Sequence, residues 1–229
     1  NERYEAWGNL ARKLAHEIKN PLTPIQLSID RIKEKYIQQV DKNEKDNFEE
    51  NLKIINNQIK QIGNLVNEFS DFARMPKPIL KNNDLIKIIN ENIKLLTEID
   101  PTIKIDFMNN KSSILLECDK EQISRVIFNL IKNSIESIQQ KAENTSNFDK
   151  IITIEIFERN NQIYIIIIDS GLGFENIKNN IKDILNPYFT TKKKGTGLGL
   201  SIVNKIINDH NGEINFVSIP NGAKIEIRF

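Results

Sequence analysis

The chain has 229 residues, of which 39% are hydrophobic and 28% are charged, as is usual for a soluble, packed protein. Its 32 lysines and arginines nearly cancel its 31 aspartates and glutamates, so no global field favours nucleic acid or a membrane surface as a partner. The single cysteine, Cys118, excludes an internal disulfide and fits a reducing compartment. The longest apolar run, around residues 163–168, is too short to span a bilayer.

Apolar residues recur every three or four positions over residues 10–36 and again over residues 48–69, which predicts two long amphipathic helices. The polar segment 38–47 between them predicts a loop, so the helices are expected to pair as an antiparallel hairpin. One hairpin cannot cover both apolar stripes. A second copy of the chain, completing a four-helix bundle, is the economical solution.

Pro76 and Pro78 break the helical pattern and predict a domain boundary near residue 75. Beyond it, Asp84 and Asp119 suit the N-cap positions of two helices. Strands are predicted at residues 77–84, 102–108, 113–119, 151–158, 163–169, 212–218 and 223–229, and helices at residues 85–96, 120–140 and 198–209. This mixed order predicts an α/β sandwich with helices on one face of a mixed sheet.

A histidine stands in the first helical stretch, in the sequence LAHEIKNPLTPI. At about 100° per residue, His16 points about 160° away from the apolar stripe, so we expect it to face solvent. An exposed imidazole beside a carboxylate is equipped as a nucleophile, because Glu17 can hold one ring N–H. Taken alone, however, His16 and Glu17 are better interpreted as a solvated surface pair.

The segment NLIKNS, residues 129–134, places Asn129 and Asn133 one turn apart on a helix face. Amide oxygens at that spacing can hold a hydrated Mg²⁺ ion and its phosphates without adding negative charge. In isolation, a polar helix face in an asparagine-rich protein is the better interpretation.

The segment DSGLGF begins with Asp169, directly after a run of isoleucines. A carboxylate anchored at the edge of a core can accept a hydrogen bond from an exocyclic amine such as that of adenine. Gly171 and Gly173 let the backbone turn and approach a flat ring closely. A turn after a strand is a common alternative for such a sequence.

The segment GTGLGL, residues 195–200, runs straight into a predicted helix. Its N–H groups and the helix N-terminus face an anion, and the lysines at 192–194 add positive charge. It is not the dinucleotide fingerprint, which needs a strand before it. Phe189 could anchor this segment hydrophobically. An amphipathic helix follows immediately, which argues against a glycine-rich linker.

Taken in order, HEIKNP, NLIKNS, DSGLGF, PYFTT and GTGLGLSIV resemble the phosphoacceptor, N, G1, F and G2 boxes of the sensor histidine kinases of two-component signalling. The resemblance covers nearly the whole chain, and WGNLARKLAHEIKNPLTPIQLS and FSDFARMPKP are most similar to the nitrogen-regulation NtrY-type kinases. It implies a homodimeric histidine-phosphotransfer hairpin over residues 1–75. A catalytic ATP-binding domain of the Bergerat (GHKL) type, using ATP and Mg²⁺, is implied over residues 79–229.

The resemblance also implies roles for individual residues. His16 is the implied phosphoacceptor, with Glu17 as its acid/base partner. Asn133 is the implied Mg²⁺ ligand, with Asn129 in support, and Asp169 is implied to contact adenine. The other implied ATP-binding positions are Gly171, Gly173, Phe189, Lys192, Gly195, Thr196, Gly197, Leu198, Gly199 and Leu200.

Two prolines follow His16 closely, and the resemblance implies that the first of them bends the helix and lets the histidine-bearing segment move. An Asn or Thr at the position of Asn20 is proposed in the family to position water against the phosphorylated regulator, which would make the protein a phosphatase as well. The alternative is that Asn20 only eases the bend before Pro21. One departure from the family is Ala223, which follows Gly222 where Thr or Ser is usual.

We therefore expect an ATP-dependent autokinase that phosphorylates His16 and passes the phosphoryl group to an aspartate on the receiver domain of a response regulator. One alternative is a GHKL ATPase, but those enzymes have a glutamate base where this chain has Asn129. The other is a nucleotide-binding dimeric scaffold without kinase activity. The chain starts without methionine, and we expect a cytoplasmic fragment of a parent anchored in the inner membrane.

Overall fold

The computed structural model describes residues 2–73, 75–145, 147–174, 181–186, 189–190 and 197–229. The chain divides into two compact units, one built by the first two helices and the other by the elements that follow Lys77. Within the described ranges, no helix combines the length and the apolarity that a bilayer span needs.

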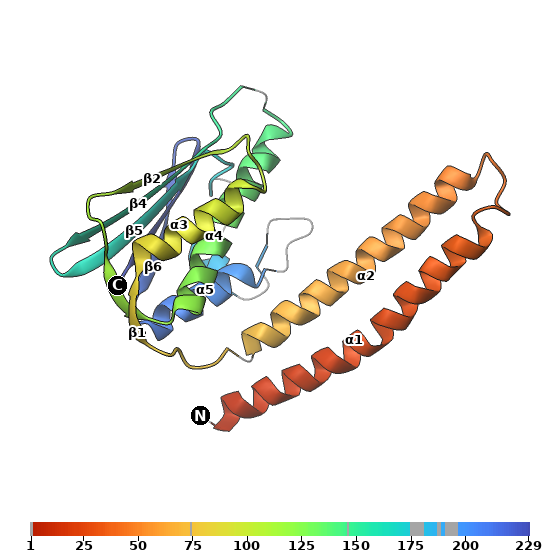
Figure 1. Ribbon diagram of the computed structural model, residues 1–229, viewed down its shortest axis with the longest axis horizontal. Helices are drawn as coiled ribbons and strands as arrows, with labels where there is room; N and C mark the ends of the chain where they lie inside the picture. The colour runs from red at the N-terminus through yellow and green to blue at the C-terminus, as the bar shows by residue number, and fades with distance from the viewer. Residues whose placement is uncertain (1, 74, 146, 175–180, 187–188, 191–196) are drawn as a thin grey trace. The chain divides into compact units, whose positions relative to one another are not determined.

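The first unit is a hairpin of two long helices, α1 (Glu2–Tyr36) and α2 (Lys45–Ala73), which run antiparallel along most of their length (Figure 1). Its buried centre is formed by Ile29, Leu52 and Ile59, with Leu22 and Phe48 packed against them. These residues all belong to the two predicted apolar stripes, so periodicity alone located both helices and their contact.

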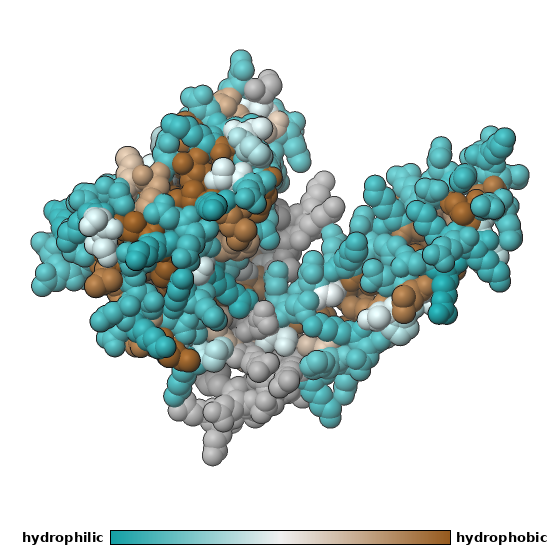
Figure 2. Space-filling view, viewed as in Figure 1, coloured by the Kyte–Doolittle hydropathy of each residue, from teal (hydrophilic) through white to brown (hydrophobic). Residues whose placement is uncertain are grey.

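The hairpin covers only part of its apolar surface. Along the α2 stripe buried and exposed positions alternate, whereas most described members of the α1 stripe are exposed. The exposed side chains of both stripes stay 41–45% exposed, and brown apolar patches are visible on the hairpin in Figure 2. The exposed members of the two stripes are Leu14, Ile18, Ile25, Ile32, Tyr36, Ile55 and Ile62. A single hairpin therefore leaves a substantial part of its apolar surface uncovered.

The second unit is built on a five-stranded mixed sheet with strand order β2-β4-β5-β7-β6. Its strands are β2 (Lys104–Asn109), β4 (Ile151–Arg159), β5 (Gln162–Asp169), β6 (Glu213–Ile219) and β7 (Gly222–Arg228). β2 runs parallel to β4, and the other neighbours are antiparallel. The predicted hairpin turn lies between β4 and β5, where Asn160 and Asn161 adopt the left-handed conformation of a type I′ turn.

Three helices cover one face of this sheet (Figure 1): α3 (Leu85–Thr97), α4 (Lys120–Ala142) and α5 (Gly199–Asp209). α4 packs between α3 and α5 and against β4 and β5. Buried and half-buried residues alternate along β4 and β5, so one face of each strand, mostly isoleucine, enters the core. Each fully buried isoleucine contributes about 1.5–3 kcal/mol, which makes this layer the main source of stability.

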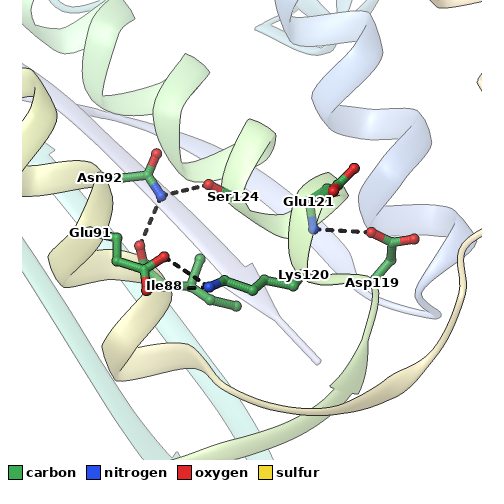
Figure 3. A network of polar contacts seen from close by, with 7 residues as sticks. All are labelled: Ile88, Glu91, Asn92, Asp119, Lys120, Glu121 and Ser124. Carbon is green, nitrogen blue, oxygen red and sulfur yellow. Dashed lines mark hydrogen bonds and ion pairs between the residues drawn. The ribbon is translucent and has the colours of Figure 1, made fainter.

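The two predicted N-caps are present. The Asp84 side chain accepts from the N–H of Ile86, and the Asp119 side chain accepts from the N–H groups of Glu121 and Gln122. Figure 3 shows the start of α4 beside α3, where Asn92 Nδ2 donates to Ser124 Oγ at 2.9 Å and fixes the two helices against each other.

The first predicted strand is shorter than expected. β1 (Lys81–Asp84) pairs with β3 (Leu115–Cys118) in a separate two-stranded sheet. Pro76 and Pro78 have no N–H to donate to a ladder, and the N–H of Ile79 donates instead to Asp119 Oδ2 at 2.9 Å. A side-chain acceptor thus replaces strand pairing in this stretch.

The second histidine of the chain, His210, has a structural role. His210 is buried after the end of α5, where its Nε2 accepts from the N–H of Asp119 at 3.0 Å. Its Nδ1 lies 2.7 Å from the carbonyl oxygen of Ile206, so Nδ1 carries the proton that this contact needs. His210 therefore joins the end of α5 to the start of α4.

Candidate functional site

Asp169 ends β5 at the edge of the core and is 5% exposed. Its Oδ1 accepts from the N–H of Gly171 at 2.9 Å, and its Oδ2 accepts from Ser134 Oγ at 2.9 Å. Burial raises the pKa of the Asp169 carboxyl, and hydrogen bonds from Gly171, Ser134 and the N–H of Ala223, with the charge of Lys141, oppose the rise. A carboxylate offers about four acceptor positions, so one remains for a ligand donor.

The segment after β5 is held close to α4. A Cβ added at Gly171 would lie 2.2 Å from Ser137 Oγ and 2.9 Å from Asp169 Oδ1. The same Ser137 hydroxyl accepts from the N–H of Leu172 at 3.0 Å. Gly173 has a φ of +68°, and a Cβ there would meet the carbonyl oxygen of Gly222 at 2.4 Å. Both glycines are thus required by the close approach of neighbouring protein atoms.

The turn between β6 and β7 also lies close to Asp169. Asn221 is left-handed, with a φ of 64°, and a Cβ at Gly222 would lie 1.9 Å from the carbonyl oxygen of Asp169. Ala223 pairs with Asp169 across the two strands, and its N–H supports the carboxylate. Ala223 lacks the hydroxyl that the family resemblance leads us to expect at this position, but its backbone N–H still donates to Asp169.

α4 also carries the two asparagines of the NLIKNS segment. Asn129 and Asn133 are both half-buried, and Asn133 directly precedes Ser134, which bonds Asp169. Among the described residues, no group of three or more His, Cys, Asp or Glu side chains could hold a metal ion. Amide oxygens together with ligand oxygens are the alternative donor set for a hard cation such as Mg²⁺.

The remaining predicted nucleotide residues lie between β5 and α5. A short 3₁₀ helix, η1 (Ile181–Leu185), precedes Phe189, which is half-buried and donates its N–H to the carbonyl oxygen of Asn186 at 3.2 Å. Gly197 is left-handed, with a φ of +70°. Leu198 directly precedes α5, and Gly199 and Leu200 are the first residues of that helix. Lys192, Gly195 and Thr196 lie outside the described residues.

His16, Glu17 and Asn20 are all exposed on α1, as predicted for His16 from the angle it makes with the stripe. Adjacent helix positions diverge by about 100°, so Glu17 flanks His16, whereas Asn20 follows one turn later on the same face. α1 continues through Pro21 and Pro24. Neither proline has an N–H, so the helical bonds they would have donated to the carbonyls of Glu17 and Asn20 are missing next to the histidine.

Sequence reasoning missed the side chains that support Asp169. Ser134 contacts Asp169 at the end of β5, and Ser137 and Lys141 contact the segment that follows it. The three residues lie at positions i, i+3 and i+7 of α4. That spacing places them on one helix face, beside the asparagine that the sequence did single out. The spacing was the available signal, and it becomes informative only once the helix is known to face Asp169.

The sequence patterns of two protein families match this chain. Residues 6–78 match the His Kinase A (phospho-acceptor) domain, and residues 118–229 match the histidine kinase-, DNA gyrase B-, and HSP90-like ATPase.

Two curated relatives align over essentially the full chain. Nitrogen regulation protein NtrY of Azorhizobium caulinodans is 37% identical over 227 residues, which are 99% of this chain and 29% of that protein. A putative sensor histidine kinase, NtrY-like, of Rickettsia felis is 35% identical over 229 residues, which are 100% of this chain and 37% of that protein. The chain thus spans about a third of the length of these relatives.

Solved structures share the fold. Histidine kinase ThkA in complex with response regulator protein TrrA has a TM-score of 0.66 and 27% identity, covering 100% of this chain and 63% of that chain. The catalytic domain of ThkA in a nucleotide-free form has a TM-score of 0.56 and 27% identity, covering 66% of this chain and 94% of that chain. The predicted fold class, a helical hairpin followed by an α/β sandwich, is therefore confirmed.

The close approach of Gly222 to β5 gives a stability test. Gly222→Ala is expected to lower the free energy of unfolding by about 1–3 kcal/mol, because the new methyl must displace the carbonyl of Asp169. Gly199→Ala is the matched control in the same domain, since no atom lies within 4 Å of its added Cβ and alanine favours a helix. Urea unfolding measures both variants, and equal stability of the two would contradict the geometry.

Proposed function

We propose, because this chain belongs to the sensor histidine kinases of two-component signalling, that it is an ATP-dependent autokinase that phosphorylates His16 and passes the phosphoryl group to an aspartate of a response regulator. The observation that carries the proposal is the buried carboxylate of Asp169 between close-packed glycine segments, in the domain that matches a histidine kinase-like ATPase. An exposed histidine on the helix that matches the phospho-acceptor domain supplies the second half of the reaction.

Adenine recognition follows from the acceptors and donors around Asp169. The carboxylate keeps an acceptor position for the exocyclic amine of adenine, while its other positions are satisfied from α4, β7 and its own loop. Gly171 and Gly173 have no side chain to hold a flat ring away from the backbone. A base that presents a carbonyl in place of the amine would set an acceptor against an acceptor, so this site favours adenine.

The phosphates and Mg²⁺ are assigned to α4 and to the glycine-rich segment before α5. Asn133, supported by Asn129, offers an amide oxygen to Mg²⁺, which supplies charge neutralisation at the transferring phosphoryl group. Lys192 and the backbone N–H groups of residues 195–200 suit the remaining phosphate oxygens, with the N-terminus of α5 favouring negative charge. These donors position the phosphates and need no covalent chemistry of their own.

Transfer to His16 is a displacement at the γ-phosphorus. A ring nitrogen of His16 forms the N–P bond, the bond to the bridging oxygen breaks, and ADP leaves with that electron pair. Glu17 takes the ring proton, which restores a neutral imidazole carrying the phosphoryl group. The missing helical bonds at Pro21 and Pro24 give the histidine segment local freedom to adjust its position. The phosphoryl group then moves to an aspartate carboxylate of the regulator.

A homodimer is proposed from the uncovered face of the hairpin. Part of each apolar stripe is buried between α1 and α2, and the exposed members stay 41–45% exposed in the single chain. A second hairpin laid on this face completes a four-helix bundle and leaves His16 on the outside.

The two alternatives fit the residues less well. A GHKL ATPase that hydrolyses ATP for conformational work needs a glutamate as the water-activating base, and an amide at Asn129 cannot take up that proton. A scaffold that binds nucleotide without using it has no need of an exposed histidine beside a carboxylate. The ThkA structure holds a histidine kinase with a response regulator, which supports the receiver domain as the partner proposed here. We place this fragment in the cytoplasm and its parent in the inner membrane.

Replacing the phosphoacceptor separates chemistry from binding. His16→Gln is expected to abolish phosphate incorporation from radiolabelled ATP and Mg²⁺, with ADP affinity unchanged, because His16 lies in the hairpin and not in the nucleotide domain. His210→Gln removes the other histidine of the chain and is expected to remain labelled with an acid-labile phosphate. Label that persists in His16→Gln would refute the assignment.

Replacing the adenine acceptor tests the nucleotide site. Asp169→Asn is expected to lose about 1–3 kcal/mol of ADP binding, because the amide offers a donor where adenine needs an acceptor. The fold is expected to persist, since the amide can still bond Gly171 and Ser134 and buries no charge. Calorimetry measures both variants, with Asp106→Asn as the surface control, and unchanged ADP affinity in Asp169→Asn would rule out the adenine role.

We also propose that Asn20 supports a phosphatase activity toward the phosphorylated regulator. Its amide lies one turn after His16 on the exposed face, where it can orient water by hydrogen bonding without acting as a base. Asn20→Ala is expected to slow the loss of phosphate from a phosphorylated regulator while His16 labelling stays nearly normal. If both activities fall together, Asn20 serves only the helix geometry before Pro21.

A further inference from the structure

Lys141 lies in the last turn of α4, outside every motif that the sequence singled out. Its ammonium donates to the carbonyl oxygens of Ser170 at 2.8 Å, Gly171 at 3.1 Å and Asn221 at 3.2 Å. An ammonium has three N–H donors and no acceptor, so these three bonds use its whole capacity.

The surroundings hold the ammonium at this point. Lys141 Nζ lies 4.7 Å from the centroid of the Phe148 ring, in cation–π range, and the side chain is half-buried. A surface lysine samples many rotamers, whereas this one is fixed by three carbonyls and an aromatic face. Such a fixed cation has a specific role in the packing of the backbone that it contacts.

Three side chains of α4 together hold Asp169, the last residue of β5, and the three residues that follow it. Ser134 bonds the carboxylate of Asp169, Lys141 bonds the carbonyls at 170 and 171, and Ser137 accepts from the N–H at 172. These are the residues that place the adenine carboxylate and the glycine against which the base would lie.

Of these three side chains, Lys141 also bonds a second segment of the chain, the turn between β6 and β7. Its bond to Asn221 holds the β6–β7 turn, and the next residue, Gly222, approaches the carbonyl of Asp169 so closely that a Cβ would lie 1.9 Å away. Without the ammonium, three carbonyl dipoles would converge with no donor between them, and the two segments would move apart.

We propose that Lys141 is a positioning residue for adenine-nucleotide binding, which holds the segment after β5 and the β6–β7 turn together so that Asp169 meets the base in one fixed geometry. This inference rests on the proposed nucleotide function. Lys141 acts through the backbone of Ser170, Gly171 and Asn221, and it does not itself touch the nucleotide.

The test measures ADP binding to the full chain by calorimetry, with unfolding by urea followed in parallel. Lys141→Met keeps the length of the side chain but removes all three donors, and Lys141→Arg restores donors that reach the same carbonyls. Lys120→Met is the matched control, because Lys120 stands at the other end of the same helix in an exposed ion pair with Glu91 (Figure 3).

The expected result is a dissociation constant for ADP raised about tenfold or more in Lys141→Met, since small displacements of positioning groups have effects of this size. Lys141→Arg is expected to recover most of the affinity, and Lys120→Met to bind as the unmodified chain does. Should Lys141→Met fail to fold, Lys141→Gln, which keeps an uncharged NH2 group with two N–H donors, is measured by the same criteria.

Two outcomes overturn the inference. Unchanged ADP affinity in a folded Lys141→Met variant shows that Lys141 does not position the site, and loss of the fold in both the Met and Gln variants shows that it supports the domain as a whole. Failure of the unmodified chain to bind ADP would instead overturn the proposed function itself, so the two failures are distinguishable.

Discussion

A carboxylate at the edge of an apolar core must be satisfied by donors that the fold brings to it, and Asp169 imposes this constraint on the whole second domain. Its donors come from α4 through Ser134, from its own loop through Gly171 and from β7 through Ala223, and the charge of Lys141 lies nearby. An unpaired buried carboxylate costs several kcal/mol, so the positions of α4 and β7 relative to β5 are tied to this one group. The three hydrogen bonds that stabilise the Asp169 carboxylate leave one of its acceptor positions for a ligand.

The hairpin differs from the second domain, because its apolar surface is only partly covered within one chain. Buried and exposed members alternate along the α2 stripe, and most described members of the α1 stripe are exposed, so covering them would favour association with another chain. His16 lies away from that surface and stays exposed, which suits the phosphoacceptor role proposed for it. In the proposed function, the second domain thus binds nucleotide through a fixed, hydrogen-bonded site, and the hairpin acts through an uncovered apolar face and an accessible histidine.

Features that depend on neighbouring residues in the sequence could be predicted, and features that depend on register could not. Period 3.6 located α1 and α2, and the caps at Asp84 and Asp119 marked the starts of α3 and α4. The support of Asp169 by Ser134 and Lys141 could not be read in advance, because it depends on which face of α4 meets the end of β5. The shortened β1 likewise depends on a long-range bond between Ile79 and Asp119.

The most direct test of this account compares two nucleotides on the unmodified chain. Inosine triphosphate differs from ATP at the base. A carbonyl oxygen replaces the exocyclic amine from which Asp169 is inferred to accept a hydrogen bond. With inosine triphosphate, the buried carboxylate faces a carbonyl oxygen, which is another acceptor. Two acceptors that face each other without a proton between them reduce affinity strongly. The account predicts that calorimetry finds ATP bound about tenfold or more tightly than inosine triphosphate, and equal affinity for the two would contradict it.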